Sequence, residues 1–223
     1  SKVLTTPSPE VVDVGEDGEY VLTIFTDIYD FWAWGGENFG DFILSVEADQ
    51  VSGSDLSSYG VLFRFQDEAN FYLFEISKIG QYAVHRKADG DWEALVPWTD
   101  SPAINAGVGW NLLRVVCQGP YMNFYVNNVH VTDVTDNTFS NGDIGFYVST
   151  DEGATDLEVA FDNLQVRRND APPATGFEFE DDFSKKLGGW ETKLGEGREA
   201  DYKDDQFEIS ILDPDTYHLV ASF

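Results

Sequence analysis

The chain has 223 residues, of which 42% are hydrophobic and 15% aromatic, enough to bury the core of one large β-domain or of one domain plus a fragment. Its 13 basic and 41 acidic residues give a formal net charge of −28. Such a surface disfavours nucleic acid and anionic lipid, which both require Lys and Arg, and suits cations or cationic partners. No apolar run approaches the roughly 20 residues of a membrane span. The single cysteine, Cys117, permits no intrachain disulfide and, in the apolar run Leu112–Cys117, is predicted to be a buried structural thiol.

Alternation of apolar and polar residues with a period of two predicts β-strands along most of the chain. The predicted strands are, in order, Tyr20–Ile24, Phe42–Ala48, Tyr59–Gln66, Phe71–Ser77, Gln81–Lys87, Trp110–Cys117, Tyr121–Val126, Ile144–Val148 and Leu157–Val166. In the third of these, Phe63 and Phe65 should share one face, with Arg64 on the other. Turn residues separate the strands, and no stretch shows helical periodicity with caps. Many short strands at this spacing predict an all-β sandwich or barrel.

A short repeat indicates a second, partial module near the C-terminus. Asp17–Ile24, DGEYVLTI, recurs as Asp204–Ile211, DDQFEISI. The segment Glu180–Trp190, EDDFSKKLGGW, precedes the second copy and has no counterpart before the first. Asn169–Thr175, NDAPPAT, interrupts the strand pattern with two prolines. We therefore expect an N-terminal segment (1–15), one nearly complete module that lacks its opening strand (16–168), a Pro-containing hinge (169–179) and the opening strands of a second module copy (180–223).

Four segments together carry a resemblance to a known family. They are Tyr59–Lys87, Asp91–Asn105, Trp110–Val134 and Asn141–Val166. Their order resembles the concanavalin A-like jelly-roll modules of laminarinase-type glycosidases and of many non-catalytic bacterial surface proteins. It is most similar to the non-catalytic kind, which is often tandem in secreted or membrane-anchored multidomain proteins. The resemblance implies a jelly-roll sandwich and an extracellular or cell-surface location.

The pattern of carboxylates argues against glycoside hydrolysis. Retaining glycosidases hold two carboxyl groups about 5–5.5 Å apart, which on a strand requires acids at alternate positions. Phe71–Ser77 carries only Glu75, and the alternating acids between Glu178 and Asp182 lie at the predicted hinge. The three histidines lie far apart in the sequence and belong to no Ser/His/Asp signature. We therefore expect no catalysis.

A carbohydrate-binding site is the main molecular alternative. Sugar sites combine aromatic faces with a few planar polar groups, and Trp92 and Trp98 lie in or near predicted loops. Glu75 interrupts the apolar face of Phe71 and Leu73, so one sheet face should be partly polar. The candidate glycan-binding residues are Arg64, Tyr72, Glu75, Arg86, Trp92 and Trp98. In the alternative interpretation the two tryptophans cap the sandwich, and the charged residues form a cross-strand ladder.

The resemblance also implies a structural calcium ion between the first and last strands of the module. The matching residue on the last strand is Asp162, and the acids of the opening segment are Asp181 and Asp182. Calcium prefers oxygen ligands, which an acidic chain supplies. In the alternative interpretation Asp162 faces solvent or caps a turn. No organic cofactor is expected.

The C-terminal segment favours self-association by strand addition. In the family, the DDF…GW segment pairs beside the last strand, here Leu157–Val166, and an unfilled edge would leave backbone groups unpaired. Its apolar residues, which need burial, are Phe183, Leu187, Trp190, Phe207, Ile209 and Ile211. Folding back would bring Phe207–Ile211 to a place already held by Tyr20–Ile24, so donation to an adjacent subunit is favoured over a severed second module.

These features together predict a non-catalytic extracellular structural or adhesive subunit that polymerises by strand complementation between copies. Carbohydrate binding, with an extracellular polysaccharide as partner, is the alternative function. Glycoside hydrolysis is the less favoured third candidate, because it needs the carboxylate pair that the predicted strands lack.

Overall fold

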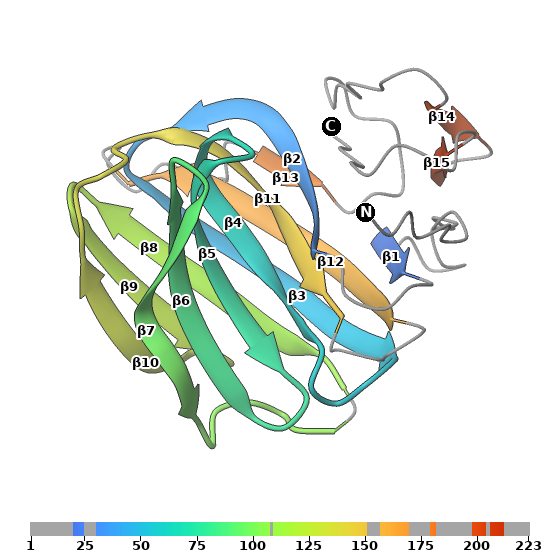
Figure 1. Cartoon of the computed structure of the whole chain (residues 1–223), viewed down its shortest axis with the longest axis horizontal. Coiled ribbons are helices and arrows are strands. Elements are labelled where there is room, and N and C mark those ends of the chain that lie inside the picture. The colour runs from blue at the N-terminus through green and yellow to red at the C-terminus, as the bar shows by residue number, and fades with distance from the viewer. Residues whose placement is uncertain are drawn as a thin grey trace, which may run out of the picture.

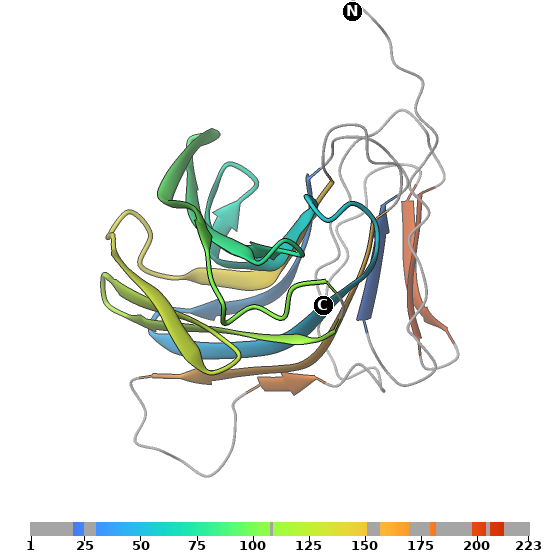
Figure 2. The same cartoon turned by 90° about the horizontal axis from the view of Figure 1, so that it is seen from below.

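The computed structural model describes residues 20–24, 30–107, 109–150, 157–169, 179–181, 198–203 and 206–211. These residues form two antiparallel sheets that lie face to face, and one separate strand pair (Figures 1 and 2). The described residues include no helix, and therefore no helix long and apolar enough to cross a membrane. The expected all-β sandwich is confirmed.

The strands fall into three sheets. The seven-stranded sheet has the order β1 (Tyr20–Ile24), β12 (Leu157–Arg168), β3 (Phe42–Ser52), β8 (Asn111–Gln118), β9 (Tyr121–Val126), β10 (Val129–Thr135). Its seventh strand, β13 (Phe179–Asp181), pairs with β12 beside β1. The six-stranded sheet has the order β2 (Asp30–Phe39), β11 (Gly142–Ser149), β4 (Ser58–Asp67), β5 (Asn70–Ser77), β6 (Gln81–Ala88), β7 (Asp91–Asp100). The third pair is β14 (Arg198–Lys203) with β15 (Gln206–Ile211).

Each predicted strand is confirmed to within a residue or is extended, but β2, β7 and β10 were not predicted. All three lie at an end of their sheet. Most residues of β7 and β10 are exposed or half-buried, so neither strand shows a clean alternation. Pro97 sits in β7, which an edge strand tolerates because one row of its N–H groups has no ladder partner.

The main core lies between the two sheets and is built from aromatic contacts. Phe146 and Phe161 stack with ring centroids 4.3 Å apart, and Phe74 lies 5.0 Å from Phe124. Cys117 is fully buried in the same core, and burial raises the pKa of its thiol to about 12. The prediction of a buried structural thiol is therefore confirmed.

Arg64 breaks the alternation of its strand. Its φ is 49°, and the register between β4 and β5 shifts after Phe63. Such a bulge adds a residue and reverses which face the following side chains occupy. Phe63 therefore packs in the main core, whereas Phe65 joins Leu62 in a smaller cluster on the other face. The prediction that Phe63 and Phe65 share a face is wrong for this reason.

The Arg64 side chain is fully buried and ties three turns together. Its guanidinium donates to the backbone carbonyls of Phe139 (3.0 Å), Gly119 (2.7 Å) and Gly40 (3.3 Å). The Asp41 carboxylate lies 3.8 Å away and supplies the opposite charge. Arg64 therefore holds the turns at one end of the sandwich, and the structure does not place it on an open surface.

The edge of β12 is filled from within the chain. Tyr20–Ile24 pairs along Leu157–Phe161, and Phe179–Asp181 pairs along Leu164–Val166. The expectation of an unfilled edge beside β12 is therefore wrong in the described residues, and donation to an adjacent subunit has no support. Phe207, Ile209 and Ile211 lie on β15 and pair with β14, whereas three further residues predicted to mediate assembly lie outside the described residues: Phe183, Leu187 and Trp190.

Replacing Arg64 by Met should lower the free energy of unfolding by about 3 kcal/mol, because buried carbonyls lose charged donors and Asp41 loses its counter-charge. Urea unfolding followed by circular dichroism measures the loss. Arg167→Met is the matched control, since Arg167 is half-buried on β12. Equal losses in the two variants would contradict the role assigned to Arg64.

Candidate functional site

A pocket of about 550 Å³ opens on the outer face of the six-stranded sheet, the face turned away from the other sheet. Hydroxyl groups of Ser58, Ser149 and Thr150 line one part of it. Aromatic side chains of Trp92, Trp98 and Tyr147 line another, and Glu75 and His85 also contribute to the lining. The pocket therefore combines apolar walls with a small set of polar groups, as small-molecule sites do.

Glu75 is the buried acid of the pocket. Its side chain is only 4% exposed. The Ser58 hydroxyl donates to Oε2 at 2.5 Å, and Nδ1 of His85 lies 3.0 Å from Oε1. A carboxylate removed from water is costly unless it is hydrogen-bonded, and here each oxygen has a partner.

The sheet register brings Glu75 and His85 together. The turn at Gly80, whose φ is 87°, pairs Ser77 with Gln81 and so Leu73 with His85. His85 is thus the diagonal neighbour of Glu75 on the same face, within reach of a long side chain. With Nδ1 donating to the carboxylate, Nε2 of the neutral imidazole is the acceptor atom.

Two tryptophans of the edge strand β7 flank His85. Trp92 and Trp98 meet the imidazole edge-on, with centroid distances of 6.0 and 6.4 Å. Each tryptophan is 42% exposed, which leaves indole surface available to a ligand. Trp92 also packs on Phe71 at 5.4 Å and on Tyr147 at 6.4 Å, which fixes its position. The predicted loop placement of these tryptophans is wrong, because both lie on a strand.

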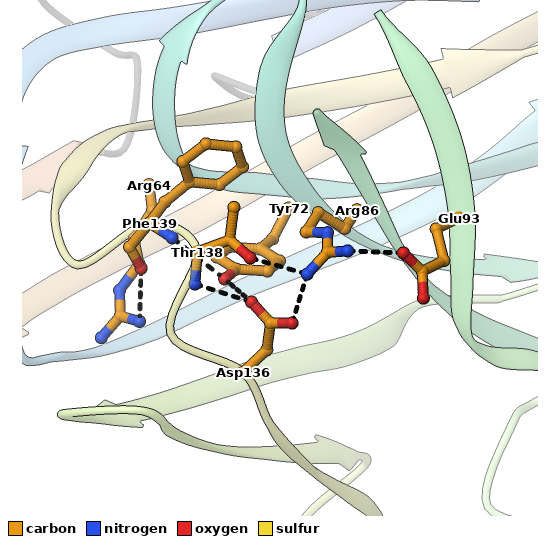
Figure 3. A network of polar contacts seen from close by, with 7 residues as sticks. All are labelled: Arg64, Tyr72, Arg86, Glu93, Asp136, Thr138 and Phe139. Carbon is orange, nitrogen blue, oxygen red and sulfur yellow. Dashed lines mark hydrogen bonds and ion pairs between the residues drawn. The ribbon is translucent and has the colours of Figure 1, made fainter. Parts of the chain in front are cut away.

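The other glycan-binding candidates lie elsewhere. Figure 3 shows Tyr72 and Arg86 in a network with Asp136, which follows β10. Arg86 also donates to Thr138 at 2.6 Å and pairs with Glu93. Tyr72 belongs to the main core between the sheets. The structure therefore brings Glu75, Trp92 and Trp98 into one pocket and separates them from Arg64, Tyr72 and Arg86.

The alternative interpretation of the six candidate glycan-binding residues, with tryptophans that cap the sandwich and charged residues that form a cross-strand ladder, does not agree with the structure. The two tryptophans line a pocket on a sheet face and do not cap the sandwich. The charged residues form no ladder, because Glu75 pairs with His85, Arg86 with Asp136, and Arg64 with Asp41.

Asp136 is held in its ionised form by its partners. Burial opposes ionisation, but hydrogen bonds from Tyr72 and Thr138 and the charge of Arg86 hold the pKa of Asp136 below its ordinary 3.8. Burial, together with the hydrogen bond to Asp136, raises the pKa of Tyr72 to about 12. The network is therefore a charged hydroxyl–carboxylate–guanidinium unit that fastens the loop after β10 to β5, β6 and β7.

The proposed calcium ligands do not converge in the described residues. The Asp162 carboxylate accepts from the backbone N–H of Asn163 at 2.6 Å, where a bulge gives Asn163 a φ of 53°. Asp181, on β13, pairs with Leu164 of β12, and Asp182 lies outside the described residues. No group of three or more His, Cys, Asp or Glu arranged to hold a metal occurs in the described part of the chain. Calcium stays a prediction.

Sequence reasoning missed His85, Ser58 and Tyr147. A signal for His85 existed, because the short turn before Gln81 fixes the hairpin register and places His85 diagonal to Glu75. Ser58 and Tyr147 had no such local signal. They reach the pocket through pairing of β4 with β5 and β11, which joins segments far apart in the sequence.

Comparison with known proteins identifies both a family and a fold. The model of a family described as 3-keto-alpha-glucoside-1,2-lyase-like domain matches residues 5–167. No curated protein matches the chain. Solved structures that share the jelly-roll fold include carbohydrate-binding module CBM66 from Bacillus subtilis (19% identity, TM-score 0.55, covering 65% of this chain and 84% of that one). A functionally unknown protein from Saccharomyces cerevisiae is also similar (19% identity, TM-score 0.50, covering 77% of this chain and 96% of that one). So is a native glycosidic hydrolase (12% identity, TM-score 0.50, covering 70% of this chain and 78% of that one).

The family match overturns the expectation of no catalysis, because the family is described by a lyase activity. The restriction to the non-catalytic kind of jelly-roll module is not confirmed. The physical reason is that a missing carboxylate pair excludes only the mechanisms that need one. An elimination needs one positioned base, which a single histidine with an orienting carboxylate can supply.

Replacing Ser58 by Ala should lower the free energy of unfolding by about 1.5–3 kcal/mol, because the buried Glu75 carboxylate loses its hydroxyl donor. Ser77→Ala is the matched control: Ser77 is buried directly opposite Ser58, and its hydroxyl has no hydrogen-bond partner among the described residues. Urea titration of both variants gives the comparison, and a loss in Ser77→Ala as large as in Ser58→Ala would refute the assigned pair.

The depressed pKa of Asp136 predicts an acid-dependent contribution to stability. Because the pKa of Asp136 is lower in the folded state than its ordinary 3.8, ionised Asp136 contributes fully to stability above pH 3.8. The contribution is lost as the pH falls through the lower pKa of the folded state. The difference in melting temperature between the wild type and Asp136→Asn should therefore be large near neutral pH and shrink in acid. Asp91→Asn, at an exposed position, should show no such trend. A difference independent of pH would rule this account out.

Proposed function

The chain belongs to the 3-keto-alpha-glucoside-1,2-lyase-like domain family, and on that premise we propose that it binds a glycoside in the pocket beside Glu75 and His85 and eliminates the group at C1 of a 3-keto sugar. The observation that carries the proposal is the hydrogen-bonded Glu75–His85 pair, set in an open pocket between two exposed indoles.

The chemistry of a 1,2-elimination defines what the site must supply. A ketone at C3 acidifies the proton on C2, because the resulting carbanion is delocalised onto the ketone oxygen. A base removes that proton, the electron pair forms the C1–C2 double bond, and the C1–O bond to the aglycone breaks. The aglycone takes up a proton and leaves as an alcohol. The reaction needs one group that accepts a proton and can return it.

His85 has the arrangement expected of that group. Its Nε2 is the acceptor atom, and its Nδ1 is engaged by Glu75 at 3.0 Å. Glu75 acts as a positioning residue: it fixes the orientation of the ring and stabilises the imidazolium that forms after proton transfer. Ser58 holds the carboxylate from its other oxygen at 2.5 Å, so both partners of the pair are oriented before substrate binds.

Sugar binding is assigned to the pocket walls. Trp92 and Trp98 offer indole surface for the C–H face of a pyranose ring, and the hydroxyls of Ser149 and Thr150 lie in the same lining. This part of the proposal is independent of turnover, and it matches the carbohydrate-binding alternative drawn from the sequence. The extracellular location and an interaction with polysaccharide remain predictions.

His85→Gln should reduce turnover of a 3-keto glucoside by about 100-fold to 10,000-fold, because the positioned base is lost. Glycoside binding should persist, since the indoles remain. Release of the aglycone measured by chromatography gives the rate, and titration calorimetry gives the affinity. His130→Gln is the control, because His130 also pairs with an acid, Asp133, but lies on the other sheet. Unchanged turnover in His85→Gln would disprove the assignment.

A further inference from the structure

The charges around the pocket carry an inference about the class of sugar, which rests on the proposed function. We propose that the site discriminates against anionic sugars, so that its substrates are uncharged or amino-substituted glycosides. Carboxylated, sulfated and phosphorylated sugars are then excluded. The argument starts from Glu75, the acid in the pocket, and continues with the placement of the nearby cations.

Among the residues that the structure describes, Glu75 has no permanent cation as a partner. Its contacts are the neutral hydroxyl of Ser58 and the imidazole of His85. Because its side chain is 4% exposed, its charge is screened less by water and salt than a surface charge would be. An anionic group entering the pocket would meet this field at close range, and like charges brought together at a binding site weaken binding.

The described part of the lining has no permanent cation that could compensate a ligand's negative charge. The described residues that line the pocket include no lysine or arginine. Lys87 pairs with Trp92 in the sheet, and its ammonium lies over the rings of Trp92 (5.2 Å) and Phe71 (5.6 Å). Arg64 is bound to turn carbonyls, and Arg86 belongs to the Asp136 network. Sites built for carboxylate or phosphate instead present an arginine fork to the ligand.

The whole chain reinforces the local field. A net charge of −28 repels anions before they reach the pocket, within a screening length of about 8 Å at physiological ionic strength. The same field favours a ligand with an amino group. Exposed indoles add to this preference, because the face of an aromatic ring attracts a cation, as Lys87 over Trp92 already illustrates within the chain.

The test compares three matched probes by titration calorimetry at low salt: methyl glucoside, methyl glucosaminide and methyl glucuronide. We expect the first two to bind and the glucuronide to bind about tenfold more weakly or worse. Glu75→Gln should reduce that penalty, whereas Asp133→Asn, which removes one exposed charge on the other sheet, should leave it unchanged.

Each outcome decides the inference. A glucuronide affinity within about twofold of the glucoside overturns the charge discrimination and leaves the proposed function intact. If Asp133→Asn relieves the penalty as much as Glu75→Gln does, the assignment of the penalty to Glu75 is overturned. Failure of all three probes to bind overturns both the inference and the proposed site. The wild-type comparison decides the matter by itself if Glu75→Gln does not fold.

Discussion

A buried carboxylate that must be hydrogen-bonded is the constraint on which the candidate site depends. Glu75 stands on a strand whose neighbouring positions are apolar, and it is almost fully removed from water. Burial of that charge is tolerable only with donors on both oxygens, which Ser58 and His85 provide from the strands on either side. The requirement therefore fixes an imidazole in place and leaves its second nitrogen available for chemistry.

The six-stranded sheet separates its structural polar groups from those of the candidate site by face. Arg64, Tyr72 and Arg86 belong to contacts that close the sandwich and fasten its turns. Glu75 and His85 lie on the opposite face, in a pocket to which the edge strand β7 contributes both tryptophans. An edge strand suits this role, because its side chains stay partly exposed and can contact a ligand without opening the main core.

The sequence predicts the fold well where strands are central and alternate in polarity, as in Phe42–Ser52 and Asn111–Gln118. It fails where the backbone departs from simple alternation. The alternation pattern assigns Arg64 to a sugar-binding face, but the bulge at Arg64 directs its side chain into the interior. No local sequence signal predicts this bulge. Glu75, Trp92 and Trp98 could be predicted as site residues from their chemistry, whereas Ser58 and Tyr147 reach the pocket only through pairing between distant strands.

The most direct test of the central claim is nitrogen NMR of the His85 imidazole, before and after addition of a glycoside. The account predicts that Nδ1 carries the proton shared with Glu75, that Nε2 is the unprotonated nitrogen, and that the Nε2 resonance moves when the glycoside binds. The His130 ring, paired with Asp133 on the other sheet, should stay unchanged. A glycoside that binds without moving the His85 resonances would contradict the assignment of the pocket.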